Sequence, residues 1–136
     1  MKAPWIVEGC ALYTKRLTHS CHFTERILAP GAEAEEHVRI TQALSKLSGS
    51  VVLLDERGAN MTSKEFSSFL GKRRDRGETL IFVLGGAYGV GADIRAKGYE
   101  TIALSRMTFP HELCKLVFLE QLYRAYTILE GRGYHH

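Results

Sequence analysis

Apolar residues recur along the chain at two different spacings, which predicts helices alternating with strands. Helical spacing over residues 5–17 predicts an opening amphipathic helix, and a second helix is expected over 33–47. Between them, a weakly alternating stretch at 23–28 predicts a short strand that ends at the breaker pair Pro30-Gly31.

Two longer apolar runs, at 50–54 and 79–84, have the continuous pattern of strands that are buried on both faces. A helix is predicted between them, because Thr62 and Glu65 have the spacing of a capping box. This helix is expected to end at Gly77, since glycine readily adopts the left-handed conformation of a C-cap.

A short strand over 101–104 and a long helix over 111–129 complete the pattern. The long helix carries two apolar seams, Leu116, Leu119, Tyr123 and Tyr126 on one and Phe118, Leu122, Ala125 and Leu129 on the other. One seam can cover the sheet while the other meets a second subunit, which predicts a homodimer through this helix. Burial of both seams within one chain is the alternative.

These elements predict an α/β fold in which a mostly parallel sheet carries helices on both faces, within a single domain of residues 1–136. Ligands of such folds bind beyond the carboxyl ends of the strands. Asp55, Gly85 and Ser105 fall at those ends.

Composition narrows the class of protein only slightly. With 45% hydrophobic and 24% charged residues, the chain is expected to fold without a disulfide or a metal. Its formal net charge of +3 is too small to indicate nucleic-acid binding by itself. No run approaches the roughly 18 apolar residues of a membrane span and no leader is visible, so a cytoplasmic protein is expected.

The three cysteines, Cys10, Cys21 and Cys114, fit a reducing cytosol better than a disulfide scaffold, because their number is odd. The run from His19 to His22 contains metal-binding residue types. No second ligand cluster lies at a suitable spacing from it, so no metal is expected.

Two glycine-rich or polar loops are the candidate ligand sites. The segment 85–91 lacks the Gly-Lys-Ser/Thr of a phosphate-binding loop and the Gly-x-Gly-x-x-Gly of a dinucleotide fold, which disfavours a nucleoside triphosphate. Its close backbone approach suits an adenosine-like or amino-acid group, and an ordinary turn is the alternative. In the loop 104–111, Thr108 can cap the final helix, Pro110 is tolerated in its first turn, and free amides there can bind a polar ligand.

Five motifs together resemble one known family. They are Leu54-Asp55, Gly85-Gly86-x-x-Gly89, Leu104-Ser105-x-x-Thr108-x-x-His111, Leu122-Tyr123-Arg124-Ala125 and Tyr134-His135. In this order they resemble the ribosomal large-subunit pseudouridine N3-methyltransferase H family, over roughly residues 4–135.

The resemblance implies a SPOUT-class fold, a homodimer whose chains tie a trefoil knot in the C-terminal half and bind S-adenosylmethionine there. The acceptor would be a pseudouridine of 23S ribosomal RNA, methylated at N3 in the assembled ribosome. The implied donor-site residues are Leu54, Gly85, Gly86, Gly89, Leu104, Ser105, Arg106, Met107, Thr108 and Phe109. The implied acceptor-side residues are His111, Arg124, Tyr134 and His135.

N3 of pseudouridine is an imide nitrogen that loses its proton as the methyl group arrives, so a base or a fixed cation lowers the barrier. His135 can act as the base and Arg124 as the cation. The alternatives are an interface ion pair for Arg124 and a frayed tail for Tyr134 and His135.

The chain departs from the family pattern at three places. The family's first strand would precede residue 4, so the sheet is expected to have one strand fewer than in the family. Glu33, Glu35 and Glu36 replace a lysine-rich segment, which weakens the expected grip on RNA. At the tail, Gly133 stands where the family has proline, and His136 stands in place of a lysine.

Two other functions remain open from the sequence. A noncatalytic donor-binding or ribosome-associated RNA-binding protein could use the basic cluster Lys72, Arg73, Arg74 and Arg76, although a solvated helix end explains that cluster as well. A hydrolase or transferase could use Cys114 or Ser105 as nucleophile, although neither has an obvious His-Asp partner set.

Overall fold

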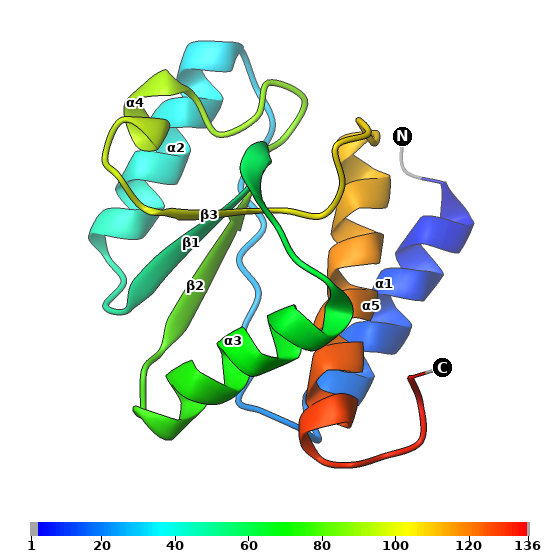
Figure 1. Ribbon diagram of the computed structural model, residues 1–136. Coiled ribbons are helices and arrows are strands. Elements are labelled where there is room, and N and C mark those ends of the chain that lie inside the picture. The colour runs from blue at the N-terminus through cyan, green and yellow to red at the C-terminus, as the bar shows by residue number, and fades with distance from the viewer. Residues whose placement is uncertain (1–2, 136) are drawn as a thin grey trace.

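The computed structural model describes residues 3–135, in which helices and strands alternate along most of the chain (Figure 1). The elements are α1 (Pro4–Leu17), α2 (Glu33–Ser45), β1 (Ser50–Asn60), α3 (Ser63–Asp75), β2 (Leu80–Leu84), α4 (Ala92–Arg95), β3 (Glu100–Ala103) and α5 (His111–Leu129).

The strands form a parallel sheet in the order β2-β1-β3, so β1 lies in the centre. Ser50 pairs with Leu80 and Leu54 with Leu84, while Val52 pairs with Glu100 on the other side. Parallel strands need crossover connections, and helices α3 and α4 lie in the two crossovers. The predicted parallel α/β sheet is therefore confirmed.

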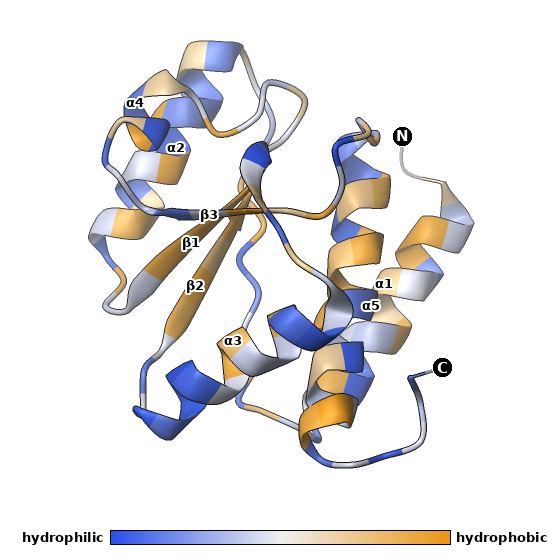
Figure 2. Ribbon diagram, in the orientation of Figure 1, coloured by the Kyte–Doolittle hydropathy of each residue, from blue (hydrophilic) through white to orange (hydrophobic). Residues whose placement is uncertain are grey.

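Helices cover both faces of this sheet (Figure 1), and the paired segments of β1 and β2 between them are mostly apolar (Figure 2). On one face, Leu53 packs with Ile40 of α2 and Ile94 of α4. On the other face, Val52 and Leu54 pack with residues of α3 and α5. Because successive side chains of a strand point to opposite faces, burial on both faces requires an unbroken apolar run.

Both seams of α5 are covered within the chain. One seam meets α1, where the rings of Tyr123 and Tyr13 lie 5.9 Å apart. The other meets the sheet and α3, where Phe118 lies 5.0 Å from Phe82 and 6.4 Å from Phe66, measured between ring centroids. The face of α5 that was expected to meet a second subunit is thus occupied by α1.

Covering α5 leaves an apolar surface on α1 itself. Trp5, Val7 and Leu12 are all exposed, with 50% of Val7 accessible to solvent. Scattered apolar residues are normal on protein surfaces, but these three share one short helix.

Helix α3 begins and ends as its sequence predicts. The Glu65 amide donates to the Thr62 hydroxyl at 3.1 Å, and the Thr62 amide donates to the Glu65 carboxylate at 2.9 Å, which completes the capping box. At the other end, Gly77 has a φ of +70° and its amide donates to the carbonyl of Arg74 at 2.9 Å.

The strand predicted at 23–28 is wrong, because residues 22–30 form no regular structure. None of the described strands pairs with this segment, and an extended segment gains the stability of a strand only by pairing. It is instead attached by Phe23, which packs against the core, and by an ion pair between Glu25 and Lys115 at 2.8 Å. Ile27 remains 70% exposed.

Two further features differ from the sequence prediction. Strand β1 does not close after Leu54 but continues to Asn60, with a register shift in which Leu54 and Ala59 both pair with Ile102. The four-residue helix α4 was not predicted, since one turn is too short to show helical periodicity.

Candidate functional site

One bulge and two loops lie at the carboxyl edge of the sheet, where the ligands of parallel folds bind. The first is the bulge 55–58, which the register shift of β1 pushes out of the sheet. The second is the glycine turn 85–91 after β2, and the third is the loop 104–110 after β3.

The glycine turn closes tightly on itself. The Gly89 amide donates to the Gly86 carbonyl at 3.1 Å, and Gly89 has a φ of +71°, a conformation that favours glycine. A Cβ atom at Gly85 would clash with the backbone of Gly89. The predicted turn residues are therefore brought together by a backbone that only glycine permits.

The loop 104–110 presents backbone groups rather than a packed surface. The Met107 amide donates to the Ser105 hydroxyl at 3.0 Å, and Met107 is 76% exposed. Within the described residues, no backbone group receives a hydrogen bond from the amides of Arg106, Thr108 or Phe109. These amides can serve a polar ligand.

Thr108 does not cap α5, contrary to the sequence prediction. Pro110 occupies the capping position and no side chain caps the helix there. The Thr108 hydroxyl instead donates to the Glu56 carboxylate at 3.0 Å. This bond joins the bulge to the loop across the edge of the sheet.

Asp55, at the start of the bulge, is neutralised by two arginines. Its side chain is only 10% exposed and accepts a hydrogen bond from the Arg57 amide at 2.9 Å. The guanidinium groups of Arg57 and Arg95 lie 3.5 and 4.0 Å from its carboxylate. Because Arg95 belongs to α4, the pair ties the end of β1 to the segment after the glycine turn.

A second cluster forms where the C-terminal tail returns to α5. The Arg124 guanidinium donates to both oxygens of Glu120, at 2.7 and 3.3 Å, and to Nδ1 of His135 at 3.1 Å. Its Cζ atom lies 5.0 Å from the centroid of the Tyr134 ring. Tyr134 and His135 are therefore docked rather than frayed.

Glu120 holds this cluster together, and sequence reasoning missed it. The Tyr134 hydroxyl donates to Glu120 at 2.7 Å and lies 3.2 Å from the Tyr13 hydroxyl. Burial, followed by these hydrogen bonds, raises the pKa of Tyr134. The hydrogen bond to Glu120 raises the pKa of Arg124. The i,i+4 spacing of Glu120 and Arg124 was the signal that could have revealed the pair.

The predicted acceptor residues are not all brought together in one chain. Arg124, Tyr134 and His135 form one cluster. His111 begins α5 directly after the loop 104–110, and Arg124 follows 13 residues later on the same helix. At 1.5 Å per residue the two are about 20 Å apart along the helix axis. The loop 104–110 is called the donor-side loop below, because the resemblance places the methyl donor there. It is thus well separated, within one chain, from the tail cluster of Glu120, Arg124, Tyr134 and His135.

The predicted basic cluster is largely paired with carboxylates. Arg73 forms ion pairs with Glu78, at 3.2 Å, and with Glu100. Two further arginines lie near carboxylates, Arg74 at 3.8 Å from Asp75 and Arg76 at 3.6 Å from Glu78. This pairing reduces the positive charge available to RNA.

The structure does not support Cys114 as the nucleophile of a hydrolase or transferase. Burial raises the pKa of the Cys114 thiol, which disfavours the reactive thiolate. Within residues 3–135, no group of three or more histidine, cysteine or acidic side chains is placed to hold a metal ion.

Comparisons with known proteins decide the family. A family profile described as "Predicted SPOUT methyltransferase" matches residues 1–135. The chain belongs to the SPOUT methyltransferases. A protein of Geotalea daltonii, named ribosomal RNA large subunit methyltransferase H, is 43% identical, and the match covers 97% of this chain and 91% of the relative. Proteins of the same name from Nitratidesulfovibrio vulgaris strain DP4 and Cytophaga hutchinsonii are 37% and 39% identical, with 92% and 91% of their lengths covered.

The described helices of this SPOUT methyltransferase include none with the length and apolar character needed to cross a membrane.

Proposed function

We propose that this SPOUT methyltransferase transfers a methyl group from S-adenosylmethionine to N3 of a pseudouridine in 23S ribosomal RNA of the assembled ribosome, in the cytoplasm. The observation that carries the proposal is the match along nearly the whole chain to relatives named ribosomal RNA large subunit methyltransferase H. The retained tail cluster around Arg124 supports it.

The carboxyl edge of the sheet suits the methyl donor. S-adenosylmethionine supplies a methyl group from a cationic sulfur atom. The tight turn at Gly85, Gly86 and Gly89 allows close backbone approach. The amides of Arg106, Thr108 and Phe109, which donate to no backbone group among the described residues, can bind the donor's polar groups. Leu54, Leu104 and Ser105 complete the proposed donor site.

The tail cluster suits an imide that becomes an anion. As N3 gains the methyl group, its proton leaves and negative charge develops on the ring. Arg124 stays protonated and is held by Glu120, so it offers a fixed positive charge to that anion. Tyr134, whose pKa is raised, stays protonated and acts as a hydrogen-bond donor.

His135 can take the proton only after a rearrangement. A guanidinium always donates, so Nδ1 of His135 accepts from Arg124 and the proton of the neutral ring is on Nε2. No lone pair is then free for a second proton. When the hydrogen bond between Arg124 and His135 breaks while Glu120 still holds Arg124, Nδ1 is released and can receive the N3 proton.

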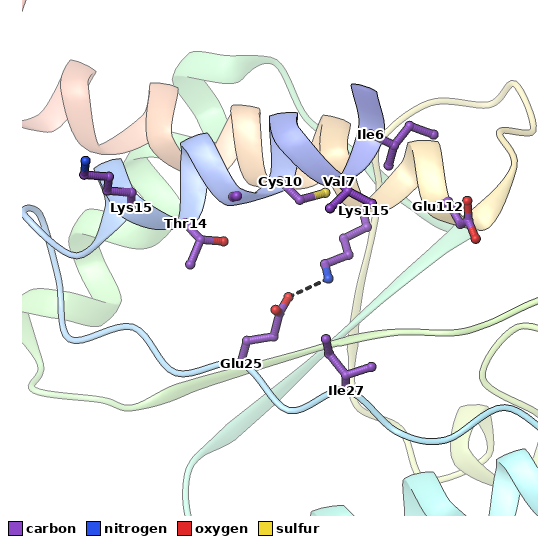
Figure 3. Close-up of a pocket in the computed structure, with 10 residues that line it drawn as sticks. Ile6, Val7, Cys10, Thr14, Lys15, Glu25, Ile27, Glu112 and Lys115 are labelled. Atoms are coloured by element: carbon purple, nitrogen blue, oxygen red, sulfur yellow. Dashed lines mark ion pairs between the residues drawn. The ribbon is translucent and has the colours of Figure 1, made fainter. Parts of the chain in front are cut away.

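A second copy of the chain would bring the two halves of the site together. The donor-side loop and Arg124 are about 20 Å apart in one chain. A groove of about 450 Å³ lies between α1, the start of α5 and the segment 22–30, which has no regular secondary structure (Figure 3). Its lining includes Ile6, Val7, Ile27 and Lys115. This groove adjoins the exposed face of α1 and supports a homodimer through α1 and α5.

We also expect the C-terminal half to form the trefoil knot of its family. Knots are otherwise nearly absent from proteins, so this expectation rests on the family match alone.

Two measurements test the proposed function. Calorimetry with S-adenosylmethionine should show binding by the wild-type protein, and ribosomes that lack the modification should accept labelled methyl groups at one pseudouridine. Donor binding without methyl transfer would instead favour a noncatalytic donor-binding protein. Absence of donor binding would contradict the methyltransferase and favour the noncatalytic RNA-binding protein.

A further inference from the structure

The carboxylate of Glu56 lies at the proposed donor site without a counter-ion. It accepts the hydroxyl of Thr108 at 3.0 Å, and within residues 3–135 it forms no ion pair. Its neighbour Asp55 is already paired with Arg57 and Arg95. The bulge therefore presents one carboxylate whose charge is balanced and one whose charge is not.

Glu56 lies beside the residues that would hold the donor, through the chain on one side and through a hydrogen bond on the other. Glu56 follows Leu54 by two positions, and its oxygen is within hydrogen-bond distance of Thr108. Leu54 pairs within the sheet, and Thr108 lies in the loop that follows the neighbouring strand β3. Glu56 bridges them, so its charge is fixed at the carboxyl edge.

We propose that Glu56 is a specificity-determining residue that favours the cationic methyl donor over the neutral product. This inference rests on the proposed function. When the methyl group leaves, the sulfur keeps the electron pair of the broken bond and the sulfonium becomes a neutral thioether. A nearby carboxylate attracts the first form and has no charge to attract in the second.

The consequence is a bias in the order of binding and release. Glu56 strengthens binding of S-adenosylmethionine and leaves binding of S-adenosylhomocysteine unchanged. Its effect is modest because the side chain is exposed, and screening by salt weakens it further. The product then leaves more readily than the donor would.

The test is calorimetry on the full chain with three ligands. The substitution Glu56→Gln removes the charge and keeps an oxygen that can accept the Thr108 hydroxyl. We expect the Kd of S-adenosylmethionine to rise about three- to tenfold, and the Kd of S-adenosylhomocysteine to stay within about twofold of wild type. Sinefungin, which carries a protonated amine in place of the methylated sulfur, should behave as S-adenosylmethionine does.

Two further variants separate charge from loop position. Thr108→Val breaks the bond to Glu56 and keeps its charge, so a purely structural role would weaken the cationic and neutral ligands equally in both variants. Asp93→Asn removes an exposed carboxylate from α4 and should change neither Kd. Equal weakening of all ligands by Glu56→Gln, or no weakening, would overturn the inference. Failure of the wild-type protein to bind any ligand would instead contradict the proposed function.

Discussion

At the scale of single residues, Glu120 links α5 to the C-terminal tail. It accepts hydrogen bonds from Arg124 and from Tyr134, both at 2.7 Å. Losing its charge would leave a half-buried guanidinium without its carboxylate and loosen the tail at the same time. Arg124, the proposed catalytic cation, is thus positioned by a residue that need not contact the substrate.

We predict that Glu120→Gln lowers the free energy of unfolding by about 1–2 kcal/mol, because a hydrogen-bonded charge pair becomes a weaker neutral contact. Urea denaturation followed by circular dichroism measures this change. The pKa of Tyr134 should also fall toward its ordinary value, since hydrogen bonding to Glu120 contributes to its rise. Glu8→Gln, at an exposed position of α1 that forms no ion pair among the described residues, is the matched control. Equal stability of the two variants would show that Glu120 does not hold the tail.

Motifs in the sequence indicated most residues of the proposed site but missed the partners that orient them. Thr108 was predicted as a helix cap, and it contacts Glu56 instead. Glu120 and Glu56 lie outside the glycine and Tyr-His motifs, so no pattern singled them out. Their roles depend on contacts across 14 and 52 residues, respectively, and local spacing does not predict such contacts.

At the scale of elements, the sequence predicted those features whose causes are local. The capping box of α3 and the bounds of α5 depend on residues within one or two turns. The strand at 23–28 failed for the opposite reason. Its alternating pattern is local, but pairing requires a free neighbouring strand, which the described sheet does not provide.

We predict that Thr62→Ala lowers the free energy of unfolding by about 1 kcal/mol, because the first turn of α3 loses its cap. Ser68→Ala removes a hydroxyl from an exposed position in the same helix and should cost much less. Urea denaturation at neutral pH measures both. A Thr62→Ala protein as stable as Ser68→Ala would show that the capping box contributes nothing.

The same cap predicts a dependence on pH. Hydrogen bonds from the amide and hydroxyl of Thr62 lower the pKa of Glu65. The ordinary pKa of a glutamate is 4.5, and folding lowers that of Glu65. Ionised Glu65 therefore contributes its full stabilisation at pH values above 4.5, and this contribution is lost as the pH falls through the lowered pKa. The stability difference between wild type and Thr62→Ala should therefore shrink on acidification below about pH 4.5.

At the scale of the whole molecule, α5 explains why one chain is insufficient for the proposed reaction. The donor-side loop leads directly into its first turn, and Arg124 lies about 20 Å further along. A rigid helix cannot bring its own two ends together. A two-fold dimer can place the Arg124 of one copy beside the donor-side loop of the other, because the symmetry repeats the same contact for both copies and so forms two equal sites.

This arrangement predicts rescue between two inactive variants. Gly85→Ala should abolish donor binding, since a Cβ there clashes with Gly89, while Arg124→Ala should bind the donor and fail in methyl transfer. Mixed and allowed to exchange subunits, the two should recover about one quarter of wild-type activity, because half of the dimers carry one intact site of two. Transfer of labelled methyl groups to ribosomes measures the recovery.

Two surface variants decide where the copies meet. Val7→Glu places a charge on the apolar face of α1, beside the groove, and should prevent both dimer formation and rescue when present in each partner. Val38→Glu makes the same change on α2, where Val38 is 53% exposed, and should leave both intact. Light scattering after gel filtration gives the assembly mass of each. Rescue that survives Val7→Glu would place the interface elsewhere, and absence of rescue with stable dimers would mean that each chain builds its own site.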